Sequence, residues 1–150
     1  MILCELAARN GDDVRGAEEL ARGYGAFRTG FSKEDFLAVY RGIYQDEAAR
    51  KDALAVVARH PNDEWSGALL LLLGEPEQSF ALFELSNSGL SDGYLNWIWG
   101  SYDASRKARQ HPAFQVFAKR IGLVDYWKQN RWPDICQPTP ENGPDAFTCR

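Results

Sequence analysis

The sequence predicts an all-α fold built from antiparallel helical hairpins, and three observations lead to that prediction. Apolar residues recur every three or four positions through most of the chain, which is the period of an amphipathic helix. Glycines stand where such helices should end, because glycine takes the left-handed conformation of a helix C-terminus at little cost. No segment alternates apolar and polar residues as a half-buried strand does. Since the connections are short, successive helices are expected to lie antiparallel.

The N-terminal half of the chain carries start signals for successive helices. Leu20 and Tyr24 belong to the apolar stripe of one helix. Ser32 followed by Asp35 resembles a capping box, in which the two residues satisfy each other's free polar groups. Asp46 is a favourable N-cap residue. Helices are therefore expected over residues 2–10, 13–27, 32–44 and 46–59.

The C-terminal half is punctuated in the same way. Gly74 and Gly122 mark helix ends. Pro76 and Pro112 suit the first turn of a helix, where the missing N–H has no partner to lose. Ser91 is a further N-cap residue. These signals predict helices over residues 63–73, 76–88, 91–102, 104–110, 112–121 and 123–130.

Prolines accumulate after Trp132, at positions 133, 138, 140 and 144, so the helical pattern must stop there. We therefore expect one helical domain over residues 1–132 and an irregular Pro-rich tail over residues 133–150. The tail holds Cys136 and Cys149, and a disulfide between them would pin it. The expected compartment is the cytoplasm, where thiols stay free. A disulfide between the two cysteines would instead favour the periplasm.

A repeat accompanies the predicted hairpins. The turns between paired helices recur in steps of roughly 30 residues, the range of a helix-turn-helix repeat. Gly16, Leu20 and Gly23 follow the first turn as a small–large–small set, and Ser79, Phe83 and Ser86 follow the third at the same offsets. Small residues at these positions let neighbouring helices approach closely.

In these residues the chain resembles tetratricopeptide-repeat (TPR) proteins. The best-matched segment is Asn62–Ser88, with Trp65, Leu70, Gly74 and Glu75 beside the small–large–small set. The resemblance implies an α-solenoid, an array of stacked hairpins with a helical cap at its C-terminal end. It covers about two-thirds of the chain; the segment 30–61 is a degenerate repeat, and the fourth hairpin matches only in length.

The last third has its own signature. Residues 109–114 (RQHPAF), 120–127 (RIGLVDYW) and 132–136 (WPDIC) resemble the C-terminal end of bacterial repeat-containing proteins. In many of these the repeats follow a winged-helix DNA-binding domain or a nucleotide cyclase. The resemblance implies the C-terminal part of a bacterial regulatory protein, or a stand-alone relative that lacks the signalling domain.

By resemblance to TPR proteins that bind peptides, the first helix of each hairpin lines a concave groove. The groove positions map onto Glu34, Ala38 and Arg41 in the second hairpin, Glu64, Ala68 and Leu71 in the third, and Asp92, Asn96 and Trp99 in the fourth. This mixture is acidic with an apolar floor. It favours a protein or peptide partner that carries Lys or Arg beside an apolar anchor.

The composition and motifs argue against other classes of function. With 45% hydrophobic and 25% charged residues the chain is globular, and its longest apolar run, residues 68–73, is too short to insert into a membrane. We find no phosphate-binding loop, nucleophile elbow or zinc spacing, and His60 and His111 each precede a proline at a helix end. The sequence therefore predicts a non-enzyme that needs no metal or cofactor.

The net charge of −4 hides an uneven distribution. Residues 104–132 carry seven bases against Asp125, whereas the rest of the chain is acidic. A basic stretch can bind nucleic acid, but the overall acidity (pI about 5.2) favours an intramolecular match to the acidic part.

Aromatic residues crowd the predicted helix 91–102, among them Trp97, Trp99 and Tyr102. They are expected to pack where the stack meets its cap, or else to anchor a ligand. The second interpretation, together with the cysteine pair, leaves an alternative function: a sensory or regulatory domain that responds to a small ligand or to redox state.

Overall fold

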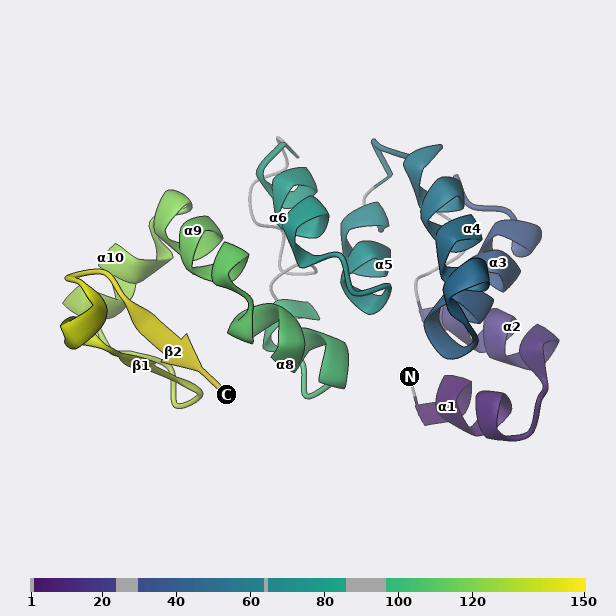
Figure 1. Cartoon of the computed structure of the whole chain (residues 1–150), viewed down its shortest axis with the longest axis horizontal. Helices are drawn as coiled ribbons and strands as arrows, with labels where there is room; N and C mark the ends of the chain where they lie inside the picture. Colours follow the sequence, from purple (N-terminus) through teal and green to yellow (C-terminus); the bar gives the residue numbers. More distant parts are fainter. Residues whose placement is uncertain (1, 24–29, 64, 86–96) are drawn as a thin grey trace. The chain divides into compact units, whose positions relative to one another are not determined.

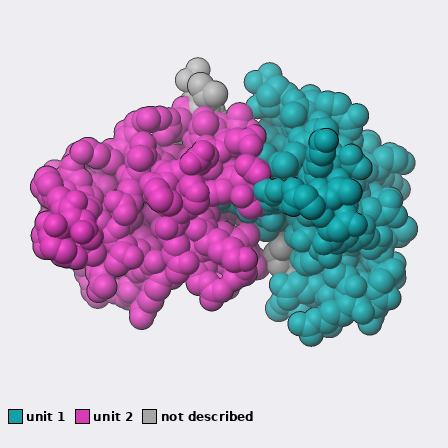
Figure 2. Space-filling model, in the orientation of Figure 1, with its two compact units in different colours: residues 1–73 teal, residues 74–150 magenta. Residues whose placement is uncertain are grey.

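The computed structural model describes residues 2–23, 30–63, 65–85 and 97–150. The chain divides into two compact units, residues 1–73 and 74–150, which are coloured separately in Figure 2. The best-matched repeat segment, residues 62–88, is divided between them. Within the described ranges, no helix is both long and apolar enough to cross a bilayer.

Unit 1 consists of helices that pack on their neighbours in sequence (Figure 1). α1 packs on α2, α2 on α3, α3 most extensively on α4, and α4 on α5. The helices predicted for this half are confirmed, and the end of the predicted helix 13–27 lies outside the described residues. The bounds are α1 (Ile2–Arg9), α2 (Asp13–Gly23), α3 (Lys33–Tyr44), α4 (Glu47–Ala58) and α5 (Ser66–Leu72).

The predicted caps are also confirmed. The Asp35 N–H donates to Ser32 Oγ (3.1 Å) and the Ser32 N–H donates to Asp35 Oδ2 (2.9 Å), which completes the capping box of α3. Asp46 caps α4 by accepting from the Ala49 N–H. Gly11 ends α1 with a φ of +68°, a conformation that other residues adopt at a cost.

In unit 1, α3 and α4 approach each other closely at Gly42. A Cβ added to Gly42 would overlap the Cβ of Ala53 and come within 3.1 Å of the Ala49 carbonyl oxygen. On the other side of α3, a Cβ at Gly16 of α2 would overlap the ring of Tyr40. The Tyr40 hydroxyl continues past Gly16 and donates to the Cys4 carbonyl of α1 (3.1 Å). Two glycines therefore set how closely α2, α3 and α4 pack.

Unit 2 combines helices with a short antiparallel sheet. α9 packs on α6, α8 and α10, and α8 also packs on β2. Of the predicted helix 91–102, the described part is helical at residues 97–99. The bounds are α6 (Pro76–Leu85), α8 (Asp103–Gln110), α9 (Pro112–Arg120), α10 (Leu123–Gln129), β1 (Cys136–Pro138), η2 (Pro140–Asn142) and β2 (Phe147–Cys149).

The tail after Trp132 differs from the prediction, because an irregular tail without strands was expected. β1 and β2 pair antiparallel, with Cys136 opposite Cys149 and Pro138 opposite Phe147. Pro138 ends its strand and the next two prolines lie in the connecting loop, so none interrupts the ladder from within. Three-residue strands are too short to display an alternating pattern.

The core of unit 2 is aromatic. Phe80 of α6 stacks on Phe117 of α9 at 4.8 Å between ring centroids. Phe147 of β2 meets the rings of Phe114 and Trp127 edge-on, at 5.8 and 5.4 Å. The hairpin is therefore anchored by a fully buried ring as well as by its ladder.

We expect Gly42→Ala to destabilise the protein by about 1–3 kcal/mol, because the added methyl group must push α3 away from α4. The matched control is Gly23→Ala in α2, where an added Cβ would meet no described atom within 4 Å. Urea denaturation of both variants measures the difference. A Gly42→Ala protein as stable as the Gly23→Ala protein would contradict the close packing of α3 on α4.

Candidate functional site

The predicted groove residues of α3 lie at the surface. Glu34 and Arg41 are exposed and Ala38 is half-buried. The Arg41 Nε–H donates to Asp13 Oδ2 (2.9 Å), which also accepts from Gln45 Nε2 (2.8 Å). Arg41 therefore already joins α3 to α2, whereas Glu34 remains a candidate for contact with a partner.

Leu71 does not fit the predicted groove. Its side chain is only 4% exposed, and Ala68 on the same helix is fully buried. Every residue of α5 from Ser66 to Leu71 is buried, so helical spacing does not select a solvent-facing position on this helix. Of the other groove candidates, Glu64, Asp92 and Asn96 lie outside the described residues.

Trp99 belongs to the aromatic core of unit 2. Its half-buried ring stands edge-on to Phe114 at 6.0 Å and to Trp127 at 5.8 Å. Trp97 stacks on Tyr102 at 5.6 Å. These contacts favour the packing interpretation of the described aromatic residues over the interpretation as free anchors.

An exposed apolar surface on α1 was not anticipated from the sequence. Ile2, Leu3 and Leu6 are 74%, 49% and 48% exposed, while Cys4 and Ala7 are buried. Positions i, i+1 and i+4 share one side of a helix, so these three side chains form one stripe. We call it the α1 stripe. The available signal was that α1 has more apolar residues than one buried face requires.

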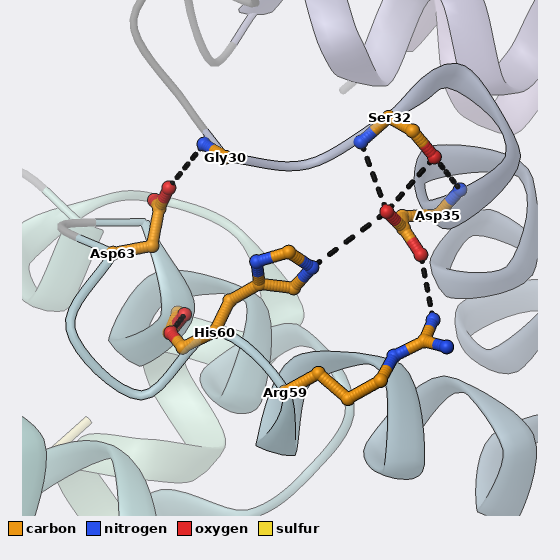
Figure 3. Close-up of polar contacts among 7 residues, drawn as sticks. Gly30, Ser32, Asp35, Arg59, His60 and Asp63 are labelled. Atoms are coloured by element: carbon orange, nitrogen blue, oxygen red, sulfur yellow. Dashed lines mark hydrogen bonds and ion pairs between the residues drawn. The ribbon is translucent and has the colours of Figure 1, made fainter.

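A second cluster joins the start of α3 to the end of α4 (Figure 3). Asp35 is at its centre. Its Oδ2 accepts from the Ser32 hydroxyl (2.8 Å) and lies 3.6 Å from His60 Nε2, while its Oδ1 accepts from Arg59 (2.7 Å). Nearby, the Gly30 N–H donates to Asp63 Oδ2 (2.7 Å). We call this group of residues the α3–α4 clasp.

The clasp contains Ser, Asp and His, but not in the order of a catalytic triad. In a triad the histidine lies between the nucleophile and the acid, whereas here Ser32 donates directly to Asp35. His60 is held by the Phe31 ring at 4.3 Å between centroids. The arrangement is that of a structural contact.

Charge explains why the clasp is stable. Asp35 lies in the first turn of α3 and Arg59 at the C-cap of α4, so each charge complements the dipole of its own helix. Burial alone would raise the pKa of the Asp35 carboxyl. The hydrogen bonds from Ser32 and the charges of Arg59 and His60 outweigh this effect, so the pKa of Asp35 lies below its ordinary value.

The basic segment 104–132 is matched within the chain. Apart from Arg109, each of its bases is paired with a carboxylate: Arg106 and Lys107 with Asp103, Lys119 and Lys128 with Asp145, Arg120 with Glu84, and Arg131 with Asp134. Hydrogen bonds from Lys119 and Lys128 lower the pKa of Asp145 to about 2. This pairing supports the intramolecular match, with Asp103 and Asp145 each shared by two bases.

Arg109 is buried, which is unexpected because a base on an amphipathic helix usually faces solvent. It is 6% exposed, and its guanidinium donates to the carbonyls of Ile98 (2.6 Å), Gly100 (3.0 Å) and Arg150 (3.1 Å). Burial and the neighbouring Arg106 lower its pKa. Arg109 therefore ties the segment before α8 to the end of β2.

Two further findings bear on the chemistry. Cys136 and Cys149 are joined in a disulfide, the bridged alternative of the sequence analysis. Within the part of the chain that the structure describes, no three His, Cys, Asp or Glu side chains are grouped to hold a metal ion.

Comparison with protein-family models, curated proteins and solved structures gives no match for this chain.

We expect Asp35→Asn to destabilise the protein by about 1–2 kcal/mol at pH 6, because Arg59 loses its charged acceptor. Since the pKa of Asp35 is lower in the folded state, its contribution is present above the ordinary pKa of 3.8 and is lost as the pH falls below it. The difference in unfolding free energy from wild type should therefore shrink at pH 3. Glu34→Gln, also in the first turn of α3, is the control, and an equal loss in both variants would contradict the clasp.

Proposed function

We propose that the protein is a non-catalytic helical scaffold that binds a protein or peptide partner, and that the α1 stripe is its main contact surface. The single observation that carries the proposal is the exposure of Ile2, Leu3 and Leu6 on one side of α1. Apolar side chains gathered at a surface are typical of interaction sites, whereas scattered ones need no explanation.

The stripe lies on a helix that is fixed in place. Cys4 and Ala7 bury the other side of α1, and the Cys4 carbonyl accepts from Tyr40 of α3. A fixed stripe loses little conformational entropy on binding, which favours affinity. Its spacing of one helical turn suits a partner that presents an apolar helix or an apolar pocket.

Acidic side chains near the scaffold surface support the expected chemistry of the partner. Glu34 at the start of α3 is exposed and available for contact with a Lys or Arg. Within the proposal, apolar contact with the α1 stripe supplies affinity, and Glu34 adds selectivity for a basic segment.

The setting follows from the resemblance of the C-terminal third. The proposal is that this scaffold is the binding part of a bacterial regulatory protein. The Cys136–Cys149 disulfide supports the periplasmic alternative, because disulfides persist in oxidising compartments.

We expect Leu6→Glu to reduce capture of the partner from extracts of the native host by about tenfold, because a buried charge replaces a buried leucine in the complex. Quantitative affinity capture with mass spectrometry measures this loss. Val116→Glu in unit 2 is the matched control, since Val116 is 56% exposed and lies outside the stripe. Glu34→Ala should reduce capture less.

A partner that Leu6→Glu and Val116→Glu retain equally would refute the α1 stripe as the contact surface. Sedimentation of the purified chain shows separately whether the captured partner is a second copy. Both substitutions replace exposed side chains, so circular dichroism should report unchanged helix content.

A further inference from the structure

Beyond the scaffold function, we propose that the Cys136–Cys149 disulfide is a reducible latch that controls how firmly residues 97–110 are held. The proposal rests on a continuous set of contacts from the disulfide to Trp99. Each contact in the series involves described residues of unit 2.

The disulfide closes the open end of the hairpin. Cys136 and Cys149 are direct partners in the β1–β2 ladder, and residues 139–146 connect the strands at the other end. The ladder has three residue pairs, too few to keep the strand ends together on its own. The disulfide therefore holds the end of β2 beside the start of β1.

Arg150, the residue after Cys149, makes the next contacts in the series. The Arg150 N–H donates to the Ile135 carbonyl (2.9 Å), next to Cys136, and its guanidinium donates to the Asp134 carbonyl (3.2 Å). These bonds and the disulfide fix the position of the Arg150 carbonyl. That carbonyl accepts from Arg109 (3.1 Å).

Arg109 transmits this constraint to the segment before α8. Its Nη1 donates to the Ile98 and Gly100 carbonyls, on either side of Trp99. The acceptors of this buried guanidinium are the backbone oxygens of Ile98, Gly100 and Arg150. Loss of the Arg150 carbonyl would leave a buried charged donor without its partner, a costly arrangement that favours movement of Arg109 and of the residues bound to it.

The reaction that opens the latch is thiol–disulfide exchange with a dithiol. A thiolate of the dithiol attacks one sulfur and forms a mixed disulfide, and the other cysteine leaves as a thiolate. The second thiol of the reagent then displaces the remaining cysteine. Two electrons and two protons pass from the dithiol to the cysteine pair, and the reagent ends as its own disulfide.

Both cysteines are buried, so the hairpin must open before a reductant reaches the bond. The ion pairs of Asp145 with Lys119 and Lys128 hold the connecting loop against α9 and α10. Asp145→Asn should therefore speed the reduction of the disulfide by dithiothreitol. Once reduced, the variant should show the same hydrogen exchange as the reduced wild type.

Hydrogen exchange with mass spectrometry on the full chain, with and without dithiothreitol, tests the latch. We expect peptides over 97–110 and 133–150 to exchange about tenfold faster after reduction, while peptides over 112–129 change little. The Cys136→Ser/Cys149→Ser double variant should reproduce the reduced pattern. If that variant fails to fold, the dithiothreitol experiment on wild type gives the same comparison.

Arg109→Gln tests the middle contact. In the oxidised protein it should speed exchange over 97–110, and reduction should then add nothing there. Arg106→Gln, an exposed neighbour on the same helix, is the control. Faster exchange of 133–150 alone, or a loss of protection that extends through 112–129, would each overturn the proposal.

Discussion

The close contact of Gly42 with Ala53 is the constraint on which unit 1 depends. Helices of 7 to 12 residues, such as α1 to α5, are marginal in isolation and gain their stability from packing. Because α3 lies tightly on α4, Tyr40 on α3 can fill the space beside Gly16 and reach the carbonyl of Cys4. The orientation of α2 and the attachment of α1, with its exposed stripe, both follow from this arrangement.

The short helices of unit 2 also depend on packing for their stability, but the contacts are of a different kind. Its short helices surround an aromatic cluster, and the hairpin that completes the cluster is closed by a disulfide and by the buried Arg109. Six of its surface bases are paired with carboxylates of the same unit, so these charges contribute to the fold. Each unit accordingly carries one functional proposal. Unit 1 presents the binding surface on α1, and in unit 2 the redox state of the disulfide controls how firmly residues 97–110 are held.

Local signals were sufficient to predict the helices, the Ser32–Asp35 capping box and the two cysteines that can pair, because each depends on neighbours in sequence. Features that depend on distant contacts were missed. Arg109 has the spacing of a surface base and is buried only because carbonyls from residues 98, 100 and 150 converge on it. The burial of Leu71 could not be predicted from helical spacing, because α5 is apolar around most of its circumference. The two strands are too short to form an alternating pattern.

A double-mutant cycle between positions 42 and 53 tests the packing constraint most directly. In urea denaturation, Ala53→Gly should recover part of the stability that Gly42→Ala loses, because it removes the methyl group with which the new Cβ collides. The double variant should lose less unfolding free energy than the sum of the losses in the two single variants. Strictly additive effects would contradict the close approach of α3 and α4 from which the arrangement of unit 1 is derived.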